Sequence, residues 1–158
     1  MSTTPRERNA RCSVARSLEV LGEKWTLLVV REAFFGYTRF ADFRARLGIA
    51  PDVLTARLET LVEGGVLERR PYRDAGQRQR DEYVLTEAGA ELKTVLAAFA
   101  AWGDVHRPSG FGPSVVYVEE ATEQPVRVAF LTEDGRELPP DAVSVVPGPG
   151  SLSGGAAA

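Results

Sequence analysis

The chain has 158 residues, 44% of them hydrophobic, and a formal net charge of −3. This length suffices for one modest core with a small appendage, and the single cysteine excludes an internal disulfide. The first eleven residues are polar and charged, unlike a secretory signal, and two prolines and four glycines in residues 142–158 exclude a membrane-spanning helix there. We therefore expect a cytoplasmic protein with no membrane partner.

Charge is unevenly distributed along the chain. Residues 1–107 hold 17 Lys and Arg against 15 Asp and Glu, whereas residues 108–158 hold two against seven. Within residues 39–80, nine arginines stand against six carboxylates. The central segment is therefore weakly basic, which permits nucleic-acid binding of modest and salt-dependent affinity despite the acidic total.

The N-terminal part of the chain predicts an arm followed by two helices. We expect residues 1–10 to be a flexible arm. Apolar spacing then predicts one helix from Cys12 to Leu21 and another from Trp25 to about Phe35. In the connection that follows, Thr38 is a candidate cap for the next helix, and Arg39 is a candidate contact to a DNA phosphate.

The next segment has the pattern of a helix-turn-helix. A short helix ends at Gly48, because glycine adopts a positive φ without strain, and Pro51 opens a second helix that closes at Gly64. One side of this second helix is apolar, while the other carries small and hydrogen-bonding side chains. That side suits either an ordinary solvated surface or the reading of base edges in a major groove. Its candidate DNA contacts are Pro51, Asp52, Val53, Thr55, Ala56 and Arg57.

Two strand-like runs, residues 66–72 and 82–85, flank a polar turn and predict a β hairpin rich in arginine. A run of charge is usually a solvated surface. Its position directly after the candidate reading helix favours contacts to phosphates or to the minor groove, as in the wing of a winged helix-turn-helix. The candidate DNA contacts in this hairpin are Arg69, Arg73, Arg78 and Arg80, and Arg70 lies in the same cluster.

A long helix is predicted after the hairpin, with Thr86 as its N-cap and its end near His106. Its apolar stripe is longer than a chain of this size can cover. We therefore expect the stripe to pair with the first helix and with a second subunit. The predicted dimer interface comprises Val14, Leu18, Leu92, Val95, Leu96, Phe99 and Trp102.

Several motifs occur in a consistent order between about Arg11 and His106. They are Cys12-Ser13-Val14-Ala15, Gly22-Glu23-Lys24-Trp25, Arg39-Phe40-Ala41-Asp42-Phe43, Leu54-Thr55-Ala56-Arg57-Leu58, Tyr83-Val84-Leu85-Thr86-Glu87-Ala88-Gly89 and Trp102-Gly103. Together they resemble the HxlR-type transcriptional regulators, which are winged-helix relatives of the MarR group. The resemblance implies a homodimer that binds double-stranded DNA. The expected fold is mainly α with a small amount of β structure, and its DNA-binding and dimerisation domain spans residues 11–107.

The remaining residues predict a small β extension over residues 108–150. Its strand-like runs are 115–119, 126–131 and 143–146, and Glu133-Asp134-Gly135-Arg136 has the pattern of a hairpin turn. The resemblance implies that relatives with such an extension often carry a cysteine-rich ribbon there. This tail has no cysteine, so we expect no metal site of that type. Residues 151–158 are expected to be disordered.

Neither catalysis nor a cofactor is expected. The single histidine, His106, falls at a predicted helix end, where a cation suits the helix dipole, and the chain lacks a phosphate-binding glycine loop and a nucleophile elbow. Cys12 has two interpretations: a small buried hydrophobe, or a redox sensor whose thiolate is favoured by a helix N-terminus and by Arg11 and Arg16. The resemblance supports the sensor, because some HxlR-type regulators respond to oxidants or electrophiles through a cysteine at this place.

These patterns favour a dimeric, sequence-specific transcriptional regulator, a repressor rather than an activator, that responds to a small ligand or to an oxidant or electrophile. The alternative is a winged-helix module that binds small molecules or proteins and has lost DNA binding. Two residues keep that alternative open. Ala50 stands where a hydroxyl cap is expected, and Asp52 places a carboxylate at the start of the reading helix.

Overall fold

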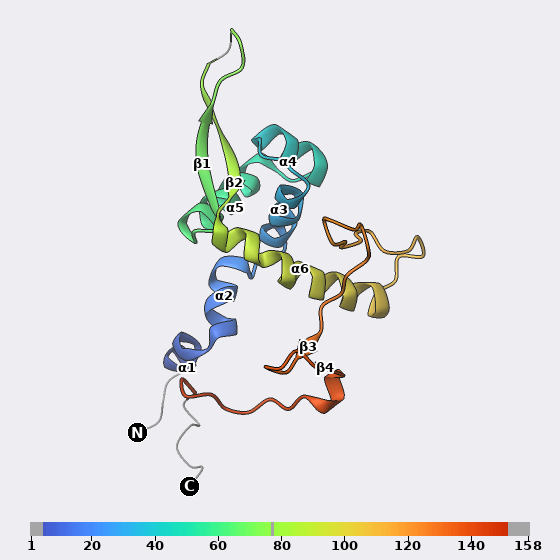
Figure 1. Ribbon diagram of the computed structural model, residues 1–158. Coiled ribbons are helices and arrows are strands. Elements are labelled where there is room, and N and C mark those ends of the chain that lie inside the picture. Colours follow the sequence, from blue (N-terminus) through green and yellow to red (C-terminus); the bar gives the residue numbers. More distant parts are fainter. Residues whose placement is uncertain (1–4, 77, 152–158) are drawn as a thin grey trace. The chain divides into compact units, whose positions relative to one another are not determined.

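The computed structural model describes residues 5–76 and 78–151, which form two compact units (Figure 1). The first unit runs up to Lys93 and the second begins at Thr94, so the boundary falls within the long helix α6, Glu87–His106. Gly89 is the one buried residue of α6. The other residues of this helix are exposed or half-buried, because little of the chain covers them.

Three helices open the first unit: α1 (Pro5–Arg11), α2 (Ser13–Leu21) and α3 (Lys24–Phe34). The two helices predicted from Cys12 and Trp25 are α2 and α3. Helix α1 occupies part of the expected arm, because the stretch after Pro5 contains no further proline or glycine to interrupt a helix. Cys12 separates α1 from α2 with an extended backbone, at φ −79° and ψ 117°.

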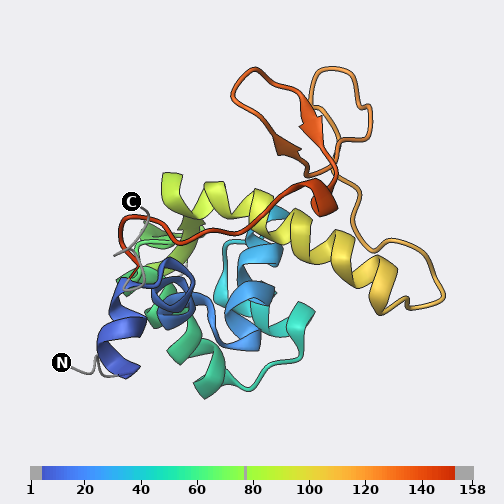
Figure 2. The same ribbon diagram turned by 90° about the horizontal axis from the view of Figure 1, so that it is seen from below.

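The helix-turn-helix consists of α4 (Phe40–Leu47) and α5 (Pro51–Glu63), and it packs on α3 (Figures 1 and 2). Gly48 ends α4 with a φ of 60°, as predicted, and Pro51 lies in the first turn of α5. The buried apolar side chains of this unit are Val29, Val30, Phe43, Ile49, Leu54, Leu58, Leu61, Val66 and Leu67. The core therefore lies among α3, α4, α5 and the base of the hairpin.

The predicted hairpin consists of β1 (Leu67–Tyr72) and β2 (Arg80–Leu85), paired antiparallel from Leu67 opposite Leu85 to Tyr72 opposite Arg80. In Figure 1 it extends away from the helices of its unit. Strand β2 begins two residues before the predicted run, because the backbone ladder continues through the polar residues Arg80 and Asp81. The first unit is thus a winged helix-turn-helix.

Thr86 joins the base of the wing to α6, as its predicted capping role requires. Its hydroxyl oxygen accepts the N–H of Gly89 at 3.0 Å, and its hydroxyl donates to the carbonyl of Gly65 at 2.6 Å. A Cβ at Gly89 would lie 2.1 Å from the carbonyl oxygen of Val66. Glycine is required at position 89 because α6 begins directly against the end of α5 and the start of the wing.

The second unit has less β structure than predicted. Its only strands among the described residues are β3 (Phe130–Leu131) and β4 (Glu137–Leu138), with one further bridge between Val118 and Pro125. The turn predicted at 133–136 does join β3 to β4, and Gly135 has a φ of 84°. The predicted strand 143–146 is wrong: it follows two prolines and a 3-10 turn, Pro140–Ala142, and pairs with no strand. Of the tail expected to be disordered, residues 152–158 lie outside the described residues.

Candidate nucleic-acid interface

Helix α5 carries its predicted DNA contacts along one side, with unequal exposure. Its fully buried residues are Leu54, Leu58 and Leu61. Pro51, Asp52 and Thr55 are exposed, whereas Val53, Ala56 and Arg57 are half-buried. Arg57 is therefore less exposed than its predicted place on the outer face implied.

The start of α5 has no side-chain cap. Ala50 is the N-cap residue, with an extended backbone, and it supplies no side-chain hydrogen bond to the first turn. The hydroxyl of Thr55 donates to the carbonyl of Pro51 at 2.9 Å, which leaves its oxygen lone pairs free to accept a hydrogen bond from a base. The first turn thus presents backbone N–H groups, one carboxylate from Asp52 and the Thr55 hydroxyl at its surface.

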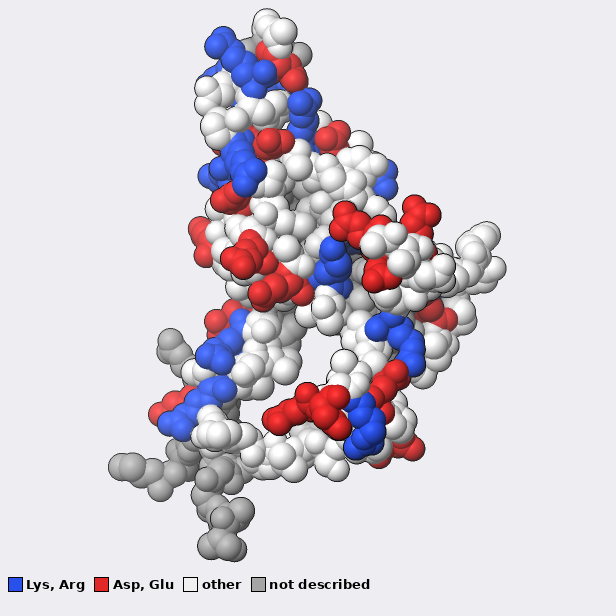
Figure 3. Space-filling view, viewed as in Figure 1, with Lys and Arg blue, Asp and Glu red and all other residues white. Residues whose placement is uncertain are grey.

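Basic side chains gather over the wing, with carboxylates among them (Figure 3). Arg78 and Arg80 are exposed, and among the described residues neither forms an ion pair. Arg70 is paired with Glu68 at 2.5 Å, and Arg69 lies 4.0 Å from Glu59 of α5. The wing therefore offers two uncompensated guanidinium groups, the type of group that binds phosphate most directly.

The connection between α3 and α4 contacts the wing, which the sequence did not predict. Thr38 does not cap α4: the N-cap residue is Arg39, and the Thr38 hydroxyl donates to Oε2 of Glu82 at 2.7 Å. The guanidinium of Arg39 forms an ion pair with Asp74 at 3.1 Å instead of standing free. The predicted cap at Thr38 is wrong because a carboxylate acceptor on β2 lies within reach of its hydroxyl.

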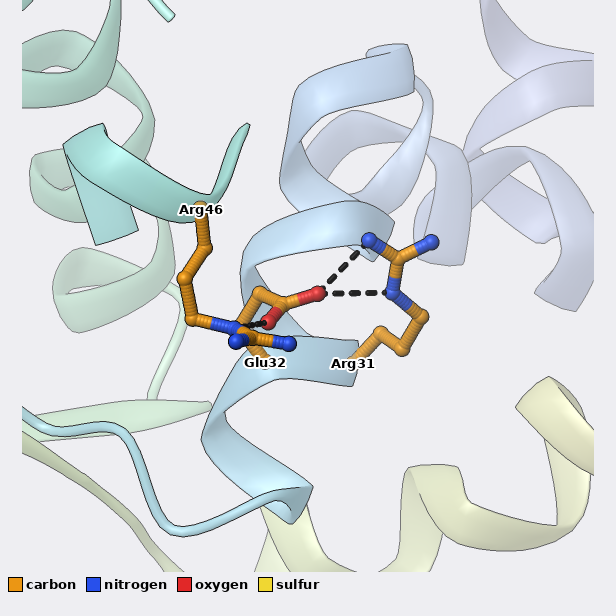
Figure 4. A network of polar contacts seen from close by, with 3 residues as sticks. All are labelled: Arg31, Glu32 and Arg46. Atoms are coloured by element: carbon orange, nitrogen blue, oxygen red, sulfur yellow. Dashed lines mark hydrogen bonds and ion pairs between the residues drawn. The ribbon is translucent and has the colours of Figure 1, made fainter. Parts of the chain in front are cut away.

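An ion-pair network around one buried carboxylate joins α3 to the first helix of the helix-turn-helix (Figure 4). Glu32 of α3 is 2% exposed, and its carboxylate accepts hydrogen bonds from Arg31 at 2.6 and 2.9 Å and from Arg46 of α4. The guanidinium of Arg46 also lies 4.1 Å from the ring of Tyr37. A buried charge is tolerated only when it is paired, so this network ties α4 to α3.

Burial raises the pKa of the Glu32 carboxyl, but the hydrogen bonds and positive charges of Arg46 and Arg31 outweigh burial and hold that pKa below its ordinary value. Sequence reasoning missed Glu32. The signal was an acidic residue two positions after the apolar run 27–30, at a helical position that faces the core.

The predicted dimer residues of both helices lie at the surface of the single chain. On α2, Val14 is 67% and Leu18 is 56% exposed. On α6, Phe99 is 60% and Trp102 is 57% exposed, and both line a shallow apolar depression with Ala98. The remaining predicted residues of α6 are Val95, which is exposed, and Leu92 and Leu96, which are half-buried. These side chains are available for a partner, since little of the chain covers them.

Cys12 is exposed, so the interpretation as a buried hydrophobe is wrong for the single chain. It serves as the N-cap of α2, and its sulfur accepts the backbone N–H of Ala15 at 3.5 Å. Arg16, which the sequence placed near the thiol, donates to the hydroxyl of Ser13 instead. The thiol is therefore accessible and lies at a helix N-terminus.

The described residues contain no group of three or more His, Cys, Asp or Glu that could hold a metal ion. Among those same residues, no helix combines the length and the apolar character needed to cross a membrane.

Comparisons with known proteins agree with this architecture. A family profile described as HxlR-like helix-turn-helix matches residues 20–110. An uncharacterized HTH-type transcriptional regulator of Mycobacterium tuberculosis is 40% identical over 139 residues, which cover 87% of each chain. The crystal structure of PA1607, a candidate transcription factor, is 39% identical with a TM-score of 0.75, and the match covers 89% of this chain and 98% of that one.

A more distant structure also matches the chain. The redox regulator HypR in its reduced form is 30% identical with a TM-score of 0.55, and the match covers 61% of this chain and 94% of HypR. The matched profile spans more than half of the chain, and the relatives are named as transcriptional regulators. With its winged helix-turn-helix, hydrogen-bonding outer face of α5 and arginine-rich wing, this chain belongs to the HxlR-like helix-turn-helix family of transcriptional regulators.

Proposed function

We propose that this protein is a dimeric, sequence-specific DNA-binding repressor that acts in the cytoplasm. One observation supports this most directly: the exposed side of α5 belongs to the same winged helix-turn-helix unit as Arg78 and Arg80, which form no ion pair with the described residues. A helix-turn-helix places its second helix in the major groove, and a wing contacts the adjacent backbone. The residues of α5 and of the wing need only bind DNA in this proposal, without catalysing a reaction.

Within this proposal the two surfaces have different roles. Thr55 and Arg57 read base edges, and Asp52 accepts a hydrogen bond from a cytosine amine. The half-buried Val53 and Ala56, with Pro51, form the close van der Waals surface against the groove. The arginines Arg78 and Arg80 contact phosphates, and Arg69 and Arg73 add positive charge beside them. Base contacts supply the choice of sequence, and phosphate contacts supply general affinity.

A repressor of this kind needs a signal, and we propose that the signal acts at Cys12 or at the dimer helices. The exposed thiol and the similarity to the redox regulator HypR support an oxidant or electrophile. With one cysteine per chain, oxidation would join two subunits or attach a small thiol. We expect diamide or a quinone to release DNA from the wild type and not from Cys12→Ser. Release from both proteins would leave a ligand at the dimer helices as the signal.

The proposal is tested by fluorescence anisotropy with DNA fragments from the protein's own promoter region and with random DNA, at several salt concentrations. We expect Arg78→Ala and Arg80→Ala each to weaken binding to all sequences and to lower the salt slope by about one per lost phosphate contact. Arg136→Ala is the matched control, because Arg136 is an exposed arginine of the second unit. Unchanged slopes in both wing variants would remove the wing from the interface.

The second candidate function is a winged-helix module that no longer binds DNA. It is favoured by Ala50, which supplies no side-chain cap, and by the exposed carboxylate of Asp52 at the start of α5. An acid at that position repels phosphates and lowers general affinity. Absence of binding to any promoter fragment at low salt would support this second function.

A further inference from the structure

Three separate segments meet at Arg39. Its two terminal nitrogens donate to both carboxylate oxygens of Asp74, at 3.1 and 3.2 Å, and its guanidinium lies 4.3 Å from the ring of Tyr72. Arg39 is the N-cap of α4, Tyr72 ends β1, and Asp74 lies in the loop of the wing. A two-point Arg–carboxylate contact with a stacked ring fixes the orientation of all three groups.

The same connection also pairs with the base of the wing. The backbone N–H of Tyr83 donates to the carbonyl of Thr38 at 2.7 Å, and Arg39 forms a β-bridge with Glu82. The Thr38 hydroxyl adds its hydrogen bond to the Glu82 carboxylate. The α3–α4 connection therefore lies beside β2 and pairs with it through a single β-bridge, so it holds the wing both in the middle of β2 and near the loop.

These contacts engage both terminal nitrogens of Arg39, whose side chain is still 44% exposed. Its guanidinium already has a carboxylate partner, whereas Arg78 and Arg80 form no ion pair among the described residues. We propose that Arg39 is a positioning residue, which together with Asp74 and Tyr72 fixes the wing on the helix-turn-helix so that Arg78 and Arg80 meet the DNA backbone. This inference rests on the proposed DNA binding, and it replaces a phosphate contact by Arg39 with a contact inside the protein.

Asp74→Asn separates the two roles. The variant keeps the size of the side chain and removes the ion pair, while the Arg39 guanidinium remains. If Arg39 positions the wing, Asp74→Asn weakens DNA binding about threefold to tenfold relative to its control, and the salt slope stays the same. If Arg39 instead contacts phosphate and Asp74 competes with the DNA, the variant tightens binding and steepens the slope by about one. This second result would overturn the inference.

Asp81→Asn is the matched control for charge. Asp81 is an exposed wing carboxylate in β2 that forms no ion pair with the described residues. The variant Asp81→Asn measures how much the loss of one negative charge near the DNA tightens binding when no ion pair is broken. Arg39→Ala completes the set: a positioning role predicts weaker binding with the wild-type slope, whereas a lost phosphate contact lowers the slope by about one.

Hydrogen exchange in the free protein tests the positioning without DNA. The amide of Tyr83 is bonded to Thr38 and belongs to the contact between the connection and β2. We expect its exchange to accelerate severalfold in Arg39→Ala and in Asp74→Asn, and to stay unchanged in Asp81→Asn. Equal exchange in all four proteins would refute the positioning role. The wild type could bind no DNA while exchange at Tyr83 still accelerated in Arg39→Ala and Asp74→Asn. The proposed function would then be refuted, whereas the contact between Arg39 and the wing would be supported.

Discussion

The charge of Glu32 makes the folding stability of the helix-turn-helix depend on pH. Its folded-state pKa lies below the ordinary 4.5, since hydrogen bonds from Arg46 and Arg31 outweigh the effect of burial. The unfolded chain therefore binds a proton at Glu32 more readily than the folded chain does. The stabilisation from Glu32 is complete above about pH 4.5 and is lost as the pH falls through the folded value.

We expect Glu32→Gln to lower the free energy of unfolding by about 1 to 3 kcal/mol at pH 7, because the two arginines lose a charged acceptor. The difference from the wild type should shrink as the pH falls below 4.5. Thermal unfolding followed by circular dichroism between pH 7 and pH 3 measures both. A constant difference across this range would contradict the assignment.

Thr55 and Arg57 are the residues that we expect to determine which DNA sequence the protein binds. Neither side chain is buried, so replacing both with alanine removes few core contacts and should change the thermal midpoint little. Each base contact contributes about 1 to 3 kcal/mol of discrimination, so binding to the specific site should weaken at least tenfold. Binding to random DNA should change far less. An equal loss on both kinds of DNA would show that these residues do not read bases.

At the scale of elements, the junction of α5, the wing and α6 depends on close backbone approach at Gly89. A methyl group there would lie 2.1 Å from the backbone oxygen of Val66, so Gly89→Ala must displace α6 or the wing base. We expect a loss of about 1 to 3 kcal/mol in the free energy of unfolding. Gly103→Ala in the same helix meets no atom within 4 Å, and it should be neutral or stabilising by up to about 1 kcal/mol. Similar losses in both variants would contradict the packing argument.

Most elements of the first unit were predictable because their signals are local. Gly48 and Pro51 mark the turn, Thr86 marks the start of α6, and these features need only neighbouring residues. The contacts of Thr38 and Arg39 were not predictable, since their partners lie 44 and 35 positions away in the chain. Short-range rules offered a cap and a phosphate contact, and the fold supplied Glu82 and Asp74 instead.

The second unit shows the limit of strand patterns. Valine-rich runs predicted three strands, yet ladder pairing reached only two residues on each side of the 133–136 turn. β-propensity describes residues that suit a half-buried pleated surface, and here Val145 is 99% exposed. A sheet needs a face to pack against, and a sequence pattern alone does not reveal whether the chain provides one.

At the scale of the whole molecule, the prediction concerns the dimer, which substitutions on α6 test directly. Phe99 and Trp102 are large and more than half exposed, and burying such side chains stabilises an interface by roughly 1.5 to 3 kcal/mol each. Sedimentation should show a dimer for the wild type at micromolar concentration and a monomer for Phe99→Glu. The matched control is Phe111→Glu, which adds the same charge at a phenylalanine that is 97% exposed outside the helices.

In the proposed function, the dimer also determines how DNA is read. Each subunit offers one α5 and one wing, which cover only a half-site, and two reading helices must stand ~34 Å apart to enter successive major grooves. The monomeric Phe99→Glu variant should therefore lose most of its affinity for a full palindromic site and keep the weak binding of a half-site. Phe111→Glu should bind as the wild type does. A monomeric variant with undiminished affinity for the full site would show that each subunit binds DNA independently, and a wild-type monomer would exclude the proposed interface on α6.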